Sequence, residues 1–164
     1  MAIVPTLGFV SKIAAINLLL TGVCQANDIQ PRSSENANLE KALYCMEILE
    51  NRPDLAPAKR IDILREQCFS EHYIQHSPHV EDGREAVLAI FAKRYQNHPD
   101  ISTSIKRTAA DGDLVWIHQH VRRGPEDLGR AVVNIFRMQE GKFAEHWNVI
   151  QAVPADSKND NSMF

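Results

Sequence analysis

The spacing of apolar residues changes at Pro99, and this change restricts the chain to one fold class. Before Pro99, apolar residues recur every three or four positions, as they do on one face of a helix. After it, apolar and polar residues alternate, as they do along half-buried strands. Helices first and strands second predict an α+β protein whose helices cover one face of an antiparallel sheet.

Proline and glycine positions divide these two halves into elements. Three helices are expected, at 39–51, 58–69 and 84–97, with Pro53, Pro57 and Pro99 at their ends. The segment 75–78 is expected to be a turn. Four strands are expected to form an antiparallel meander, at 101–108, 114–123, 130–139 and 142–152.

The first 26 residues form a separate unit in the sequence. An apolar run follows Lys12, and the run is followed by a possible cleavage site with the small residue Ala26 at its end. This pattern is typical of a secretory signal peptide. The run is shorter than the roughly 20 residues that a membrane-spanning helix needs. The alternative to a cleaved signal peptide is a hydrophobic N-terminal helix that is not removed. We expect a periplasmic or secreted protein with no stable membrane insertion after cleavage.

The mature chain is expected to hold one domain. Residues 27–38 are polar and predict a disordered linker, so the domain would span residues 39–164. Two cysteines remain in it, Cys45 and Cys68. In an oxidising compartment they can form a disulfide if their Cα atoms lie within about 7 Å, and two buried thiols on helices are the alternative.

Charge and motifs exclude several functions. Twenty-one acidic and 18 basic residues give a net charge of -3, without the basic face that a nucleic-acid-binding protein needs. The sequence contains no Gly-x-Ser-x-Gly elbow, which argues against a serine hydrolase. The pair His118 and His120 could begin a metal site, but no third ligand is fixed by the sequence, and we expect no metal.

Three segments together resemble the SnoaL-like polyketide cyclase family of the nuclear transport factor 2-like superfamily, and its predicted aldol-condensation subgroup. They are Tyr73 to Gly83, Asn134 to Arg137 and Gly141 to Gln151. The resemblance implies a cone-shaped fold in which three N-terminal helices pack on a strongly curved sheet around a deep, mostly apolar cavity. It also implies a homodimer formed through the sheet, a small apolar ligand, and neither a metal nor an organic cofactor.

The resemblance implies a catalytic arrangement from which this chain departs. In the family, an aspartate in the cavity and a histidine on the neighbouring strand exchange protons with a carbonyl compound. Asn134 occupies the aspartate position, and Asn148 replaces a second expected carboxylate. An amide cannot exchange a proton, so the remaining proton carriers are His76, His118, His120 and His146, with Glu145 as a further carboxylate. The leading hypothesis assigns catalysis to His118, His120 or His76, with Asn134 donating a hydrogen bond to the oxyanion.

The strand alternation leaves open which face lines the cavity. His118 and His120 share one face with Trp116, whereas Val115 and Ile117 take the other. On the last strand, His146 and Asn148 lie opposite Trp147. The candidate substrate-binding residues are Tyr73, Trp116, Phe136, His146, Trp147 and Asn148.

Two functions are compatible with these patterns. The first is an aldol-type cyclase, isomerase or lyase that acts on a carbonyl-bearing apolar substrate without a cofactor. The second is a ligand-binding or dimeric interaction protein without catalysis, because Asn134 and Asn148 stand where carboxylates are expected.

Overall fold

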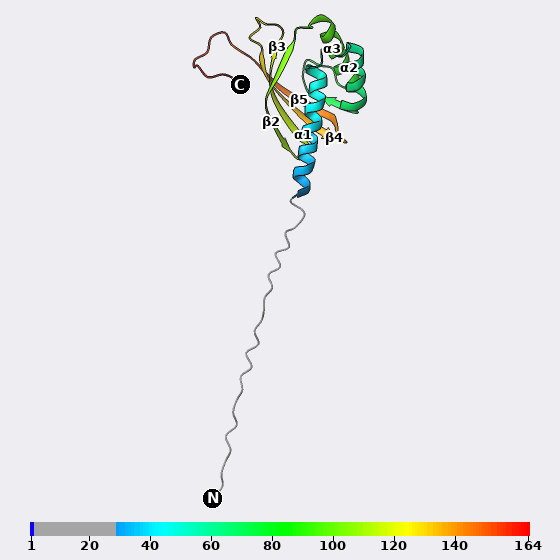
Figure 1. Ribbon diagram of the computed structural model, residues 1–164, viewed down its shortest axis with the longest axis vertical. Coiled ribbons are helices and arrows are strands. Elements are labelled where there is room, and N and C mark those ends of the chain that lie inside the picture. Colours follow the sequence, from blue (N-terminus) through cyan, green and yellow to red (C-terminus); the bar gives the residue numbers. More distant parts are fainter. Residues whose placement is uncertain (2–28) are drawn as a thin grey trace.

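The computed structural model describes Met1 and residues 29–164, in which a layer of helices covers one face of a sheet (Figure 1). The helices are α1 (Ile29–Glu50), α2 (Pro57–Ile63), which continues into a π-helix at Leu64–Cys68, and α3 (Arg84–Asn97). The strands are β1 (Phe69–Gln75), β2 (Ser102–Asp111), β3 (Leu114–Arg122), β4 (Arg130–Gln139) and β5 (Lys142–Ala152). The predicted α+β class is confirmed.

The sheet has the strand order β1-β5-β4-β3-β2. Strands β2 to β5 form the predicted antiparallel meander, and β1 pairs parallel to β5. The expectation for β1 is wrong, because the second helix was expected to continue to Phe69 and a turn to follow it. Phe69 and Tyr73 face the core, and the partner of β1 lies some 70 residues away, so the local pattern does not reveal the strand.

Helix α1 begins ten residues earlier than predicted. Residues 29–38 are helical, and the expectation of a disordered linker is wrong for them. Glu35 Oε1 accepts a hydrogen bond from the Gly112 amide at 3.0 Å, and Asn38 Nδ2 donates to the Gly112 carbonyl at 3.1 Å. Glu35 and Asn38 therefore hold the turn between β2 and β3, a partner that composition alone does not show.

The predicted signal peptide and its cleavage site lie outside the described residues. Among residues 29–164, no helix is both long enough and apolar enough to cross a membrane.

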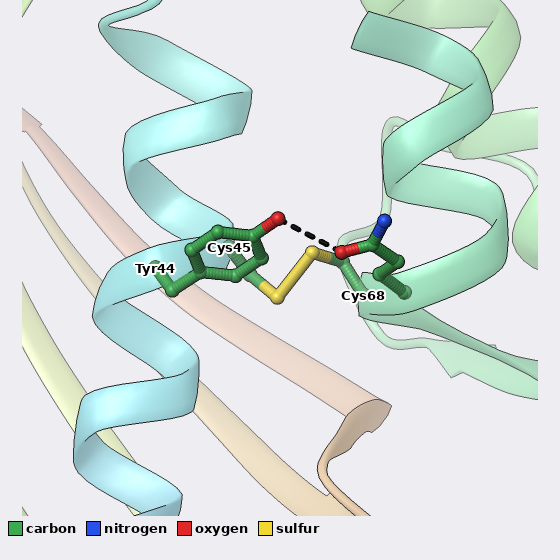
Figure 2. The surroundings of a disulfide bond; sticks show 4 residues. Tyr44, Cys45 and Cys68 are labelled. Carbon is green, nitrogen blue, oxygen red and sulfur yellow. Dashed lines mark hydrogen bonds between the residues drawn. A yellow bond between two sulfur atoms is a disulfide. The ribbon is translucent and has the colours of Figure 1, made fainter.

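Cys45 and Cys68 form a disulfide that ties α1 to the π-helix, as Figure 2 shows. Their Cα atoms are 5.5 Å apart, and both residues are fully buried. Beside the bridge, Tyr44 donates a hydrogen bond to Gln67 at 2.8 Å. Of the two alternatives left by the sequence, the structure has the bridged one.

Candidate functional site

A cavity of about 160 Å³ lies between the helices and the sheet. We call the sheet face that lines it the inner face, which carries Gln119 of β3, Asn134 and Phe136 of β4, and His146 of β5. Apolar side chains of α1, β1 and α3 form most of the remaining wall. The polar residues of the wall are Glu50, Tyr73, Gln75, Ser77, Gln119, Asn134, His146 and Asn148.

His146 is the histidine of this wall, and both of its ring nitrogens face amide groups. Nδ1 lies 2.9 Å from Oε1 of Gln75, and Nε2 lies 3.0 Å from Oδ1 of Asn134. The ring stacks on Phe136, with 4.7 Å between the centroids. Burial lowers the pKa of His146 to about 4, with a smaller contribution from the charge of His76. The imidazole is therefore neutral at neutral pH.

The partners of Gln75 fix which nitrogen of His146 carries the proton. The Ser77 amide donates to Oε1 of Gln75 at 2.9 Å, and Nε2 of Gln75 donates to the Tyr73 hydroxyl at 3.1 Å. Oε1 of Gln75 can therefore only accept, and His146 donates to it from Nδ1. Burial raises the pKa of Tyr73, so its hydroxyl stays protonated.

A neutral imidazole has one N–H, so Nε2 of His146 must act as an acceptor. Turning the Asn134 amide by 180°, which exchanges its nearly equivalent oxygen and nitrogen, places Nδ2 as a donor to Nε2. Both ring nitrogens are then satisfied by groups that do not exchange protons. In this turned orientation, the amide oxygen of Asn134 faces away from the ring.

Glu50 supplies the one carboxylate of the cavity wall within the described chain, and it is already engaged. Its side chain is only 5% exposed and forms an ion pair with Arg94, and Oε2 also accepts a hydrogen bond from Thr103 at 2.9 Å. Two strong donors thus hold Glu50, which leaves no unpaired anion to act as a base in the cavity.

The structure brings five of the predicted site residues together. Tyr73, Asn134, Phe136, His146 and Asn148 all line the cavity. Two of them, Asn134 and Asn148, are direct cross-strand partners on β4 and β5. The two positions at which amides replace expected carboxylates therefore lie side by side in one wall.

Four other candidates, Trp116, His118, His120 and Trp147, lie on the opposite side of the sheet, which we call the outer face. Trp116 of β3 pairs with Ile135 of β4, which in turn pairs with Trp147 of β5. His118 and His120 share the strand face of Trp116. The expectation that this face lines the cavity is corrected, because the apolar alternate residues Val115 and Ile117 are fully buried beneath the helices.

The outer-face histidines contact the C-terminal tail instead of the cavity. The ring of Phe164 stacks on His118 and His120, at centroid distances of 5.7 and 4.1 Å. His120 Nε2 donates to the Leu128 carbonyl at 2.8 Å. In this arrangement neither imidazole reaches a ligand in the cavity.

His76 also lies outside the cavity wall. Its Nε2 is 2.7 Å from Oε1 of Glu145, and its ring stacks on Trp147 with 4.7 Å between the centroids. Arg137 Nε donates to Oε2 of Glu145 at 2.7 Å. Arg137 and, to a smaller degree, His76 lower the pKa of Glu145. These three residues form a charged cluster at the edge of the outer face.

Sequence reasoning missed four polar residues of the wall: Glu50, Gln75, Ser77 and Gln119. Gln75 and Ser77 lie within the segment that was expected to be a turn. Gln119 could have been found from the sequence, because it is a polar residue on the same face of the strand as Val115 and Ile117. A single amide on an otherwise apolar, buried strand face indicates that the residue lines a cavity or has a specific hydrogen-bond partner.

No group of three or more His, Cys, Asp or Glu side chains in the described part of the chain is arranged to hold a metal ion. The polar wall consists chiefly of amides and hydroxyls, with one imidazole. Its chemistry suits hydrogen bonding to a neutral molecule.

Residues 56–146 match the SnoaL-like domain family. The match spans more than half of the chain, so this protein belongs to the SnoaL-like family, as its three sequence segments predicted. No curated protein sequence is significantly similar to the chain.

Solved structures share the fold at low sequence identity. TsrD from Streptomyces laurentii is 22% identical over 70% of this chain and 88% of its own, with a TM-score of 0.53. A proposed isomerase of the SnoaL-like family from Agrobacterium tumefaciens is 12% identical over 71% and 99%, with a TM-score of 0.58. An LEH-like epoxide hydrolase from M. tuberculosis is 13% identical over 71% and 84%, with a TM-score of 0.54.

Proposed function

We propose that this protein binds one small, mostly apolar molecule in the cavity and performs no acid/base chemistry there. One observation carries the proposal: both ring nitrogens of His146 are held by the amides of Gln75 and Asn134. General acid/base catalysis needs a positioned group that gains and loses a proton near the working pH. Amides do not, and a histidine with a pKa of about 4 is a weak base.

The size and lining of the cavity support a small organic ligand. A volume of about 160 Å³ is close to that of engineered apolar cavities that bind benzene. Apolar walls with a few placed polar groups are the usual composition of small-molecule sites. The fold shared with an epoxide hydrolase and a proposed isomerase supports the same class of ligand.

A cofactor-free, aldol-type enzyme acting on a carbonyl-bearing apolar substrate is the second candidate. The observation that favours it is the neutral imidazole of His146 inside the cavity. If Asn134 turned its amide toward the substrate, Nε2 of His146 would be free to accept a proton. The Asn134 amide would then donate to the oxyanion that forms.

A binding experiment with matched variants tests the proposal. NMR titration with one-ring probes such as toluene and phenol should show saturable binding at the cavity. Val87→Phe, which fills the cavity from α3, should abolish binding, as should Asn148→Phe from the opposite wall. Ala89→Phe adds the same ring to the exposed side of α3 and should bind as the wild type does. Probes that bind equally to all four proteins would refute a cavity ligand.

Turnover assays separate the two candidates. The binding proposal expects no reaction with a panel of small carbonyl compounds. The enzyme candidate expects turnover that His146→Gln lowers by about a hundredfold or more, while Asn134→Asp, which restores the family's carboxylate, keeps or raises it. Turnover that depends on His146 would refute the binding proposal and support the enzyme candidate.

We also propose that the protein works in the periplasm or outside the cell. The buried Cys45–Cys68 disulfide supports an oxidising compartment, where such bonds form and persist. N-terminal sequencing of native protein should give a start near Asn27. A start at Met1 or Ala2 would contradict this proposal.

A homodimer formed through the outer face is a further part of the proposal. This face carries Trp116, Ile135 and Trp147 side by side, and Val149 on the same side of β5 is 66% exposed. Exposed apolar side chains that gather on one face are typical of interfaces. Sedimentation analysis should give twice the chain mass, and Trp147→Glu should restore the monomer.

A further inference from the structure

We infer that Gln119 selects the ligand of the cavity: a neutral, one-ring molecule that donates a hydrogen bond from a hydroxyl or N–H group to Oε1. This inference rests on the proposed binding function and adds the chemical class of the ligand. It assigns a role to a residue that no catalytic pattern in the sequence includes.

The unpaired oxygen of Gln119 is the first observation. Gln119 is 3% exposed, and its Oε1 is the only buried side-chain nitrogen or oxygen among the described residues that has no hydrogen-bond partner. Folded proteins pair nearly all such atoms, because a buried acceptor without a donor loses its hydrogen bonds to water. An unpaired acceptor in a cavity wall indicates a donor that arrives with the ligand.

The surroundings of Gln119 provide no donor from the protein. Its cross-strand partners are Ile105 on β2 and Val132 on β4, both apolar. Two other amides of the wall are engaged, since Asn134 pairs with His146 and Gln75 pairs with Tyr73, Ser77 and His146. The remaining amide, Asn148, is only half-buried, so Gln119 is the buried amide of the wall whose oxygen has no partner.

The charges of the wall exclude an ammonium group as the donor. Glu50 is the carboxylate that could balance a cation, and Arg94 and Thr103 already hold it. A buried cation without a counter-charge is strongly disfavoured. The donor is thus a neutral hydroxyl or N–H on an apolar body of about one six-membered ring, which fits the cavity volume of about 160 Å³.

Phenol, toluene and benzaldehyde are the probes that test this inference, because they share a ring and differ in one group. The test compares the wild type with Gln119→Met, which keeps the side-chain length and removes the acceptor. The phenol-to-toluene affinity ratio should be about tenfold higher in the wild type, as expected for one added hydrogen bond. The benzaldehyde-to-toluene ratio should be nearly the same in both proteins.

A control variant and a second measurement accompany the titrations. Gln96→Met makes the same change on the exposed side of α3 and should leave all three affinities unchanged. Without ligand, Gln119→Met should unfold at a higher temperature than the wild type, because it removes the unpaired buried oxygen. A lower melting temperature would show that the protein itself satisfies Gln119, and would overturn the inference.

The outcomes distinguish this inference from the proposed function. If none of the three probes binds the wild type, the binding function itself fails. If they bind but the phenol-to-toluene ratio is the same in Gln119→Met, the cavity binds ligands and Gln119 does not select them. If benzaldehyde gains as much from Gln119 as phenol does, the amide donates instead of accepting, and the assigned ligand class is wrong.

Discussion

The two faces of the sheet carry different chemistry, although they belong to the same strands. The inner face presents Gln119, Asn134 and Asn148 around the neutral His146. The outer face and its edge carry the proton-active and charged residues His76, His118, His120, Arg137 and Glu145. Apart from His146 and the ion-paired Glu50, the proton-exchanging side chains named here and the cavity therefore lie on opposite sides of one sheet.

Desolvation explains why this arrangement is stable. Burial disfavours the charged form of a side chain. A carboxylate at position 134 or 148 would therefore need a positively charged partner or several hydrogen-bond donors, whereas an amide needs only ordinary hydrogen bonds. His146 adapts by staying neutral, and Glu50 remains buried because Arg94 pairs with it. The inner face thus holds its polar side chains without an unpaired buried charge.

The largest expected effect comes from Asn134→Asp, which places a carboxylate beside Nε2 of His146. The pKa of His146 should rise from about 4 by about 2 to 3 units, because the negative charge favours the imidazolium form. NMR titration of the imidazole ring measures this shift. Asn97→Asp, on the surface at the end of α3, is the control and should not change it. An unchanged pKa in Asn134→Asp would contradict the pairing of the two residues.

Removing the disulfide should have the next largest effect, since the bridge holds the helix layer that closes the inner face. Cys45 and Cys68 are 23 residues apart, and replacing both by alanine should lower the free energy of unfolding by about 3 kcal/mol. Urea unfolding of the variant and of the wild type measures the loss. Two freely titrating thiols in native, unreduced protein would refute the bridge.

The burial of His146 should make stability depend on pH. Its pKa is about 4 when folded and about 6.5 when unfolded, so between these values the unfolded chain binds more protons. The stabilisation is fully present above about pH 6.5 and is lost as the pH falls toward 4, by about 2 kcal/mol between pH 7 and pH 5. Unfolding experiments across this range should show the slope.

Two variants locate the source of that pH dependence on the inner face. His146→Gln should flatten the curve between pH 7 and pH 5, because no buried imidazole remains to be protonated. His118→Gln removes an outer-face histidine and should leave the slope in place. If the slope disappears in His118→Gln and persists in His146→Gln, the pH dependence arises on the outer face and the comparison of the two faces is wrong.

The smallest effect is expected at the edge of the outer face, from Glu145→Gln. Its ion pair with Arg137 and its hydrogen bond with His76 are partly exposed to solvent, and such contacts contribute less than about 1 kcal/mol. Because the folded-state pKa of Glu145 is lowered, this contribution is present above its ordinary pKa and is lost as the pH falls below it. Urea unfolding should show the small loss. Ligand binding should not change, and a large loss of binding would connect this cluster to the cavity.

Elements with strong local signals were predicted correctly from the sequence. Helix α3 and strands β4 and β5 have the predicted bounds, because apolar periodicity and the turns that flank them act over a few residues. The alternation also predicted that His146 and Asn148 share a face opposite Trp147. The family followed from three short segments, and with it the expectation of an enclosed cavity.

Other features depend on partners that are distant in the sequence. The strand β1 exists because β5 pairs with it, and the start of α1 is held by the Gly112 turn. The alternation of β3 divides its residues into two sets but cannot show which set is buried, and the position of Gln119 among valine and isoleucine was the local sign that was overlooked.

The sequence by itself determined the fold class, the alternation of the strands and the amides at positions 134 and 148. Only the tertiary structure decided that His118 and His120 lie outside the cavity, that Cys45 and Cys68 are bridged, and that Oε1 of Gln119 is unpaired. The reason is physical: periodicity follows from backbone geometry within one element, whereas burial, pKa and hydrogen-bond pairing depend on what the other elements place against it.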